Sequence, residues 1–168
     1  MSAIQNVFSK LVQVASNSEL LQQHAAVLTR AGNRPISKTI GYNHYEPCHY
    51  STDKPSAHAE KVALTKFRRY HQARAANDAK IRRKLKKTSI LIARINTRQA
   101  QALPNPPNLQ NPPNPDLHQC AHQFRNSAPC YHCTALLKSY GVSKVIFTTD
   151  RGEPQCEKGK SARGWLPI

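Results

Sequence analysis

The sequence predicts an α/β fold, a single domain in which helices cover a mixed β-sheet. Three observations lead to this prediction. A chain of 168 residues has room for one domain of ordinary size. Hydrophobic residues make up 39% of the chain, which supports a modest core. Segments with helical periodicity alternate with apolar, β-branched runs in the order helix, hairpin, helix, strand, helix, strand, which is typical of layered α/β folds.

The N-terminal segment is expected to form a helix followed by a β-hairpin. Residues 4–15 place their apolar side chains on one helical face, and residues 19–23 are compatible with a short helical continuation. Residues 25–32 and 36–43 are typical of two strands. The sequence Gly-Asn-Arg-Pro joins the two strands, and this turn composition predicts the hairpin.

A second helix and a buried strand follow. Ser56 is a suitable N-cap for a helix over residues 57–71, because its hydroxyl can accept a hydrogen bond from a free backbone N–H. Residues 72–87 are polar and strongly basic, and we expect them to extend this helix or to form a helical insertion. Residues 88–96 (TSILIARIN) are a nearly continuous apolar run, the pattern of a strand covered on both faces.

The C-terminal part is predicted to hold a loop, a helix, a strand and a tail. Residues 103–116 contain six prolines and are expected to form an extended surface loop. A helix is predicted over residues 129–140, because it starts with a proline and Gly141 suits its end. Residues 144–149 predict a strand, and residues 151–168 a polar C-terminal tail.

Composition excludes several classes of protein. No apolar run approaches the roughly 20 residues that a membrane span requires. Residues 1–10 lack the basic start and apolar segment of a secretory signal. We therefore expect an intracellular protein, cytoplasmic or nuclear, with no membrane partner. Its five cysteines then favour thiolate or metal chemistry over disulfides.

The chain is strongly basic. It has 25 Lys and Arg against 9 Asp and Glu, a formal net charge of +16. Residues 61–100 hold thirteen of the basic residues, most densely at residues 81–87. This pattern suggests a surface that follows the phosphates of a nucleic acid, or a nuclear-localisation patch. A solvated helix face that serves solubility is the alternative.

The residues that carry chemistry open two of the expected helices. His58 lies at the start of one helix, and Cys130 and Cys133 lie at the start of the other. One imidazole nitrogen and two thiolates supply three ligands of a tetrahedral zinc ion and leave a fourth position for water, as in catalytic zinc sites. Glu60 can face the metal without binding it and exchange protons with that water. A zinc site that serves folding alone is the alternative, and the presence of Glu60 argues against it.

The pattern His-x-Glu followed by Pro-Cys-x-x-Cys resembles that of the zinc-dependent cytidine and deoxycytidylate deaminases. Residues 40–43 (IGYN) are similar to the strand end whose asparagine contacts the sugar of the substrate in this family. Residues 140–147 (YGVSKVIF) are similar to the helix end and strand that follow the second metal segment. The resemblance covers roughly residues 24–70, 88–96 and 124–150, in the right order.

This resemblance implies a cytidine-deaminase-like three-layer α/β/α sandwich with a mixed sheet of about five strands. It also implies one catalytic Zn²⁺ held by His58, Cys130 and Cys133. The reaction would be hydrolytic deamination, a hydrolase acting on the C–N bond of a cyclic amidine. In it, activated water attacks carbon 4 of cytosine while Glu60 shuttles protons until ammonia leaves.

The same resemblance assigns the substrate-binding residues. Asn43 is expected to contact the sugar, and Ala59 and Tyr131 are expected to contact the substrate, with Tyr42 or Tyr131 stacking on the base. The substrate would be a pyrimidine nucleotide or nucleoside, and the positive charge favours the monophosphates dCMP and CMP. The gap between the two metal segments is longer, and the C-terminal tail shorter, than is usual in the family, which leaves substrate and homo-oligomer formation open.

A second group of possible metal ligands lies in the loops. Some deoxycytidylate deaminases carry an additional structural zinc, and the flanking loops of this chain contain suitable side chains. The favoured interpretation is ordinary loop histidines and free cysteines, because their spacing matches no strong zinc pattern. The candidate ligands are Cys48, His118, Cys120 and His122, with His49 beside them.

Three functions follow from these observations. The leading hypothesis is deamination of cytosine in a nucleotide or nucleoside. An alternative from a different class is a basic, nucleic-acid-associated structural or binding protein that retains the deaminase fold. A second alternative is a cytosine deaminase acting on a single-stranded polynucleotide, which the charge favours although no aromatic-lined channel is evident.

Overall fold

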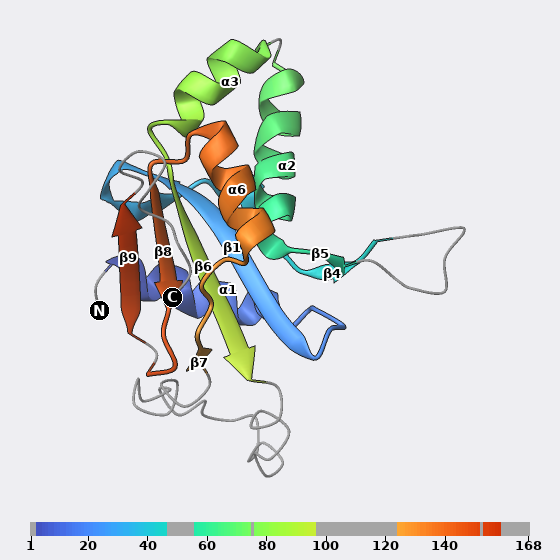
Figure 1. Ribbon diagram of the computed structural model, residues 1–168, viewed down its shortest axis with the longest axis vertical. Coiled ribbons are helices and arrows are strands. Elements are labelled where there is room, and N and C mark those ends of the chain that lie inside the picture. The colour runs from blue at the N-terminus through green and yellow to red at the C-terminus, as the bar shows by residue number, and fades with distance from the viewer. Residues whose placement is uncertain (1–2, 47–55, 75, 97–123, 152, 159–168) are drawn as a thin grey trace, which may run out of the picture.

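A computed structural model of the chain describes a three-layer α/β/α arrangement (Figure 1). The described residues are 3–46, 56–74, 76–96, 124–151 and 153–158. The elements, in chain order, are α1 (Ala3–Ala15), β1 (Gln22–Arg30), η1 (Ala31–Asn33), β2 (Arg34–Pro35), η2 (Ser37–Thr39), β3 (Gly41–Tyr42), β4 (His44–Tyr45), β5 (Ser56–Ala57), α2 (Ala59–Gln72), α3 (Asp78–Leu85), β6 (Ser89–Asn96), β7 (Phe124–Arg125), α6 (Tyr131–Tyr140), β8 (Lys144–Thr148) and β9 (Pro154–Lys158).

The sheet is mixed, as predicted. Its main path in the described residues is β2-β1-β6-β8-β9, and the short strands β3 and β7 pair with β1 and β6. β6 and β8 are parallel, whereas β1 pairs antiparallel with β6 and β9 pairs antiparallel with β8. β4 and β5 form a separate two-stranded ribbon. The crossover between the parallel strands passes through α6, which therefore lies against the sheet.

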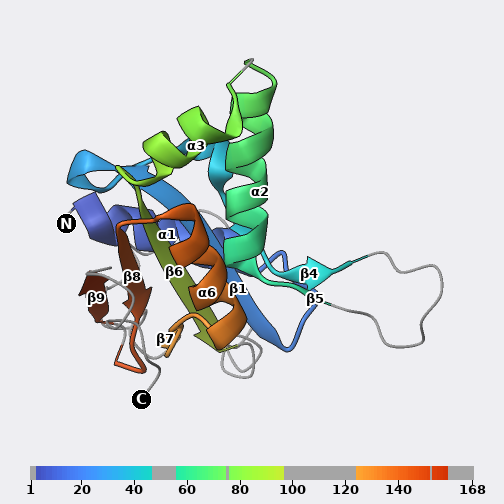
Figure 2. The ribbon, with the colours of Figure 1, turned by 45° about the horizontal axis from the view of Figure 1, so that its top comes forward.

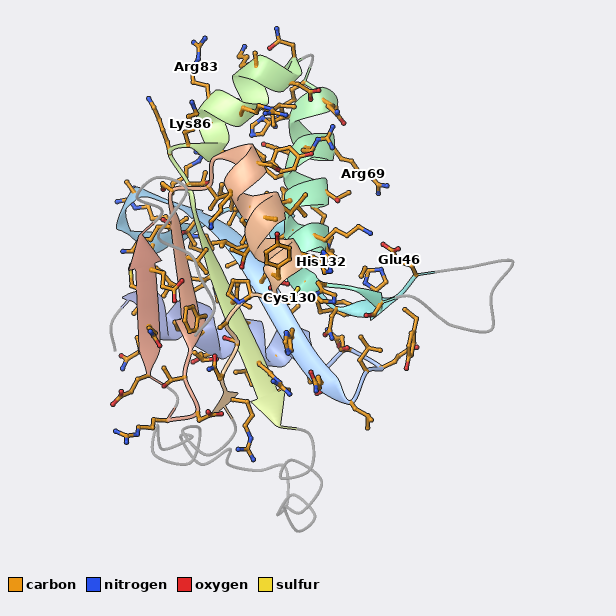
Figure 3. The ribbon with its side chains drawn as sticks, in the orientation of Figure 1. Glu46, Arg69, Arg83, Lys86, Cys130 and His132 are labelled. Atoms are coloured by element: carbon orange, nitrogen blue, oxygen red, sulfur yellow. The ribbon has the colours of Figure 1, made fainter. Side chains whose placement is uncertain are left out.

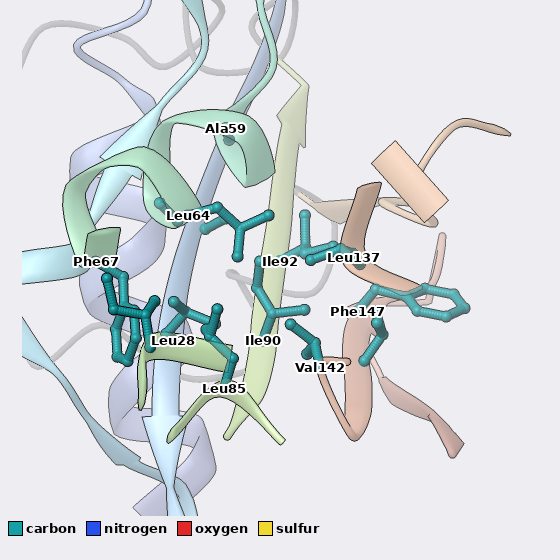
Figure 4. Close-up of a cluster of buried hydrophobic side chains, with 14 of the residues drawn as sticks. Leu28, Ala59, Leu64, Phe67, Leu85, Ile90, Ile92, Leu137, Val142 and Phe147 are labelled. Atoms are coloured by element: carbon teal, nitrogen blue, oxygen red, sulfur yellow. The ribbon is translucent and has the colours of Figure 1, made fainter. Parts of the chain in front are cut away.

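Helices cover both faces of the sheet (Figures 1 and 2). The face that bears Ala26, Leu28, Ile90 and Ile92 packs against α2, α3 and α6 (Figure 4). The opposite face, which bears the alternate residues of the same strands, packs against α1. Residues 90–93 of β6 are fully buried. The prediction of a strand covered on both faces is thus confirmed, because side chains alternate between the two faces of a strand.

The second strand of the predicted hairpin is interrupted. Residues 36–43 form η2 and β3 instead of one continuous strand. Thr39 explains the interruption, because its hydroxyl donates to the Ile36 carbonyl at 2.7 Å and accepts the Leu28 N–H at 3.1 Å. The Leu28 N–H therefore bonds to a side chain here and not to the backbone of a neighbouring strand. The hairpin itself is present, since β2 and β3 both pair antiparallel with β1.

Both helices that carry the candidate metal ligands begin later than predicted. Ser56 lies in β5 and is not the N-cap; His58 is the N-cap of α2. Cys130 is the N-cap of α6, so Pro129 precedes the helix instead of starting it. Neither His58 nor Cys130 makes a side-chain cap hydrogen bond. Their side chains are therefore available to each other. The predicted helix end at Gly141 is confirmed by its left-handed φ of 73°.

Three other segments refine the predictions. Residues 19–23 are not helical: β1 begins at Gln22 and pairs with β6 from Gln22 to Thr29. The basic segment 72–87 contains a separate helix, α3, whose N-cap Asn77 accepts the Lys80 N–H at 3.0 Å. β9 lies within the predicted polar tail.

The proline-rich segment 103–116 lies outside the described residues. None of the described helices has the length and apolar character needed to cross a bilayer.

Candidate metal centre

Three side chains from two distant segments meet at the N-termini of α2 and α6. The Nδ1 atom of His58 lies 3.4 Å from the Sγ atom of Cys130 and 3.4 Å from the Sγ atom of Cys133. All three ligand atoms lie within 4.8 Å of one another. Zinc–nitrogen and zinc–sulfur bonds of ordinary length, placed tetrahedrally, separate N and S by about 3.5 Å. The spacing of this group therefore fits a single zinc ion.

The β4–β5 ribbon and the first turn of α2 position His58. Its backbone is extended, with φ −72° and ψ 147°, and its carbonyl accepts the Val62 N–H at 3.0 Å as the first hydrogen bond of the helix. Because the imidazole does not cap the helix, it is directed to the two sulfurs. Figure 3 shows Cys130 at the end of α6 that lies beside the start of α2.

Ser127 anchors the segment that leads to the two cysteines. It is 1% exposed, and its hydroxyl lies 2.9 Å from both the Ile92 carbonyl and the Thr148 Oγ1 atom. The Thr148 N–H donates to the same hydroxyl at 2.8 Å. These contacts attach the segment to β6 and β8. The structure thereby gives Ser127 a role in positioning Cys130.

Glu60 is a buried carboxylate beside the candidate ligands. It is 2% exposed, and its Oε2 atom is buried without a hydrogen-bond partner. Burial raises the pKa of this carboxyl group, whereas its own backbone N–H, His58 and a hydrogen-bonding contact with Cys133 act in the opposite direction. A buried polar atom without a partner costs free energy, so this oxygen is available to a ligand.

The chemistry of the Cys133 thiol also favours a metal. Burial raises its pKa most, and Glu60 and Cys130 raise it further. Two sulfurs and a carboxylate so close together are unfavourable as anions unless a cation lies among them. A divalent ion would stabilise both thiolates, and the helix N-termini would add to this effect. The residues present therefore fit a zinc ion, with His58, Cys130 and Cys133 as its ligands.

A cavity of about 350 Å³ adjoins His58. Asn43 lines it, but both ends of its side-chain amide bond to the backbone of β1. Its Oδ1 atom accepts the His24 N–H at 2.7 Å, and its Nδ2 atom donates to the Gln22 carbonyl at 2.6 Å. Asn43 thus fixes the wall of the cavity, and its contact with a substrate stays a prediction. The described lining residues are Leu20, Leu21, Gln22, His24, Asn43, Tyr45, Ser56 and His58.

His24 is a cavity residue that the sequence analysis did not include. Its Nε2 atom is buried without a hydrogen-bond partner. Burial, Arg94 and His58 lower the pKa of its imidazole from 6.5 to about 4, so the ring is neutral at pH 7. The pairing of Ala25 with Tyr42 places it there, because this register brings residue 24 next to residue 43, and the sequence does not show that register.

The structure does not test the roles predicted for the other site residues. Ala59 is fully buried in the core. Tyr131 is 70% exposed on the first turn of α6 and stacks edge-on against His132. Both assignments stay predictions. The candidate ligands of a second zinc lie outside the described residues; these are Cys48, His49, His118, Cys120 and His122.

Comparison with known proteins does not indicate a reaction for this site. No protein-family model and no curated protein matches the chain. The function is therefore inferred from the side chains that meet at the metal centre.

Proposed function

We propose that the protein is a zinc-dependent hydrolase that deaminates cytosine in a free nucleotide or nucleoside. One observation carries the proposal: three zinc ligands converge beside a buried carboxylate with an unpartnered oxygen. A zinc site that only stabilises the fold is normally closed by four protein ligands. In the described part of the chain the group contains three, as expected for a catalytic site.

The residues of this site suit hydrolysis of a C–N bond. Zinc in such a site supplies Lewis acidity, which makes water nucleophilic at neutral pH. Glu60 would accept a proton from the attacking water at Oε2 and pass it to N3 of cytosine, and would then transfer the second proton of that water to the amino group. That group then leaves as ammonia, and the water oxygen remains on carbon 4 as the carbonyl of uracil. The free N–H groups at the starts of α2 and α6 favour negative charge developing there.

The cavity beside His58 is the proposed substrate site. Its volume of about 350 Å³ is in the range of small-molecule sites. His24 and Asn43 form polar parts of its wall. Its described lining includes neither Lys nor Arg, so the preference for dCMP or CMP over cytidine rests on the net charge of +16. Both kinds of substrate therefore belong in the test.

The test is an assay of the zinc-loaded protein. The full chain is incubated separately with dCMP, CMP, cytidine and a cytosine-containing single strand. Release of ammonia and the absorbance change from cytosine to uracil are followed together. Turnover of any free substrate supports the proposal, and turnover of the strand alone would assign a polynucleotide deaminase. No turnover with any of them, in protein shown to hold zinc, would refute deamination of cytosine.

The distribution of charge favours a second candidate, a nucleic-acid-binding protein with the same fold. α3 and the turn after it expose Arg82, Arg83, Lys84, Lys86 and Lys87. Binding of a nucleic acid to such a surface releases counterions, so the logarithm of the binding constant falls linearly with the logarithm of the salt concentration. Salt-sensitive binding of a single strand, together with no turnover in the assay above, would favour this candidate.

A further inference from the structure

We propose that a second cavity, at the opposite end of α2 from the metal centre, binds the phosphate group of a nucleotide. The cavity has a volume of about 350 Å³ and lies between the end of β1, the second half of α2 and α3. His71, which lines this cavity, lies about 20 Å along α2 from His58, at 1.5 Å per residue. The lining residues of the cavity are Arg30, Ala31, Phe67, His71, Lys84, Lys87 and Thr88.

Three cations surround this cavity, and each comes from a different part of the chain. Arg30 ends β1, Lys84 lies on α3, and Lys87 lies in the turn that follows α3. Within the described residues the ion pairs are Lys61–Glu46 and Arg68–Asp78, so none of the three cations has a carboxylate partner there. A bound anion would supply the missing opposite charge.

The neighbouring strand increases the concentration of positive charge. Arg34 of β2 lies directly opposite Arg30 of β1 in the antiparallel register. Like charges at such paired positions repel each other and are unfavourable. Arg34 does not line the cavity, but an anion held there by Arg30 would reduce this repulsion.

His71 gives the cavity a fixed polar wall. It is 3% exposed, and its ring packs edge-on against Phe67 and Tyr70, with centroid distances of 4.5 and 5.1 Å. Its Nδ1 atom lies 3.2 Å from the Lys84 Nζ atom. Because an ammonium group can only donate, the ring nitrogen accepts this hydrogen bond. The contact holds the Lys84 side chain at the cavity, where its other N–H groups can donate to a phosphate.

The remaining wall suits a nucleotide better than a bare ion. Ala31 and Phe67 form an apolar side, which limits access of water and strengthens the attraction between a phosphate and the cations. A sugar or base can rest against the same side. The volume is within the range of small-molecule sites. Charged groups around an apolar hollow therefore indicate a phosphorylated organic molecule.

Calorimetric titration of the full chain tests this inference. The probes are inorganic phosphate, dTMP and a short oligothymidylate, because thymine has no amino group that deamination could remove. We expect saturable binding of dTMP. The variants Lys84→Gln and Lys87→Gln should each weaken it about tenfold, the usual effect of losing one charged hydrogen bond. Arg83→Gln is the matched control, since Arg83 extends outward from α3 (Figure 3) and is not among the residues that line the cavity.

The probes also distinguish the source of the phosphate. If dTMP binds as tightly as the oligothymidylate, the ligand is a free nucleotide. If the oligothymidylate binds much more tightly and with greater sensitivity to salt, the ligand is a polynucleotide. No saturable binding of any probe would overturn the inference. An equal loss in Arg83→Gln and Lys84→Gln would also overturn it, because it would show diffuse surface attraction. These outcomes do not depend on deamination, so the two proposals can fail separately.

Discussion

The Nδ1 atom of His58 lies 3.4 Å from the Sγ atom of Cys133, although the two residues are 75 positions apart in the chain. This contact joins the start of α2 to the first turn of α6 on the face of the sheet that both helices cover. Cys133 is 4% exposed and Glu60 is 2% exposed, so the contact lies at the boundary between the core and the cavity. A metal bound there would contribute both to the stability of the fold and to the chemistry in the cavity.

Replacing Cys133 by Ser should remove zinc and destabilise the protein. The variant loses one of three ligands, and the binding energy of a metal at such a site also supports the fold. We expect one zinc ion per chain in the original protein by elemental analysis, almost none in the variant, and a free energy of unfolding lower by about 3 kcal/mol or more.

Cys156 provides the matched control for this substitution. It is an exposed free cysteine in β9, outside the candidate ligand group. Cys156→Ser should keep both zinc and stability within about 0.5 kcal/mol, as is usual for surface positions. Unchanged zinc content in Cys133→Ser would contradict the proposed coordination.

Replacing Glu60 by Gln should separate metal binding from catalysis. Glutamine keeps the shape of the side chain but cannot accept and return a proton. We expect full zinc content and a kcat lower by about 100- to 10,000-fold, the usual contribution of a general acid–base residue. Zinc content and kcat are measured on the same preparation. Loss of zinc in Glu60→Gln would make Glu60 a ligand instead.

Replacing Ser127 by Ala should lower stability more than an ordinary serine substitution does. The change removes a buried hydroxyl that accepts the Thr148 N–H and contacts the Ile92 carbonyl, which leaves polar atoms unpaired. The expected loss is about 1–3 kcal/mol in the free energy of unfolding, measured by urea denaturation. Ser139→Ala, at an exposed position on α6, is the control and should cost less than about 0.5 kcal/mol. Equal losses would show that the Ser127 network contributes nothing.

The candidate metal centre could be predicted from local sequence because its candidate ligands lie at helix starts. His58, Glu60, Cys130 and Cys133 each belong to a short motif, and an alternating α/β order brings such helix starts to one edge of the sheet. The three-layer fold follows from the same alternation and from the apolar run of β6. These features depend on spacing within a few residues, which a sequence shows directly.

Other features depend on contacts between distant segments and could not be predicted in this way. His24 reaches the cavity only through the register of β1 with β3, and the predicted strand began one residue after it. The second cavity combines Arg30, His71 and Lys84 from three segments. β9 is polar and exposed, and it forms because the edge of β8 supplies backbone partners. Its sequence has none of the apolar pattern that marks a buried strand.

Replacing Gly41 by Ala should destabilise the contact between β3 and α2. A Cβ atom at this position would lie 2.6 Å from the Val62 Cγ1 atom and 3.4 Å from the Ala63 backbone nitrogen. The strand or the helix must then move, at a cost of about 1–3 kcal/mol. Adding Val62→Ala should recover part of the loss, because it removes the atom in conflict. A double-mutant cycle by urea denaturation measures this coupling, and purely additive effects would contradict it.

Replacing His71 by Gln should make stability less dependent on pH. Burial, together with Lys84, Arg30 and Arg74, lowers the pKa of the His71 imidazole from its ordinary value of 6.5. As the pH falls below about 6.5, the unfolded chain binds a proton at this ring and the folded chain does not, so the ring destabilises the fold in acid. Above about pH 7.5 both states are neutral and the effect vanishes. The free energy of unfolding, measured by urea denaturation across this range, should therefore fall less steeply with acid in the variant. Parallel curves for the two proteins would show that the folded ring titrates as it does in the unfolded chain, and that the surrounding cations do not act on it.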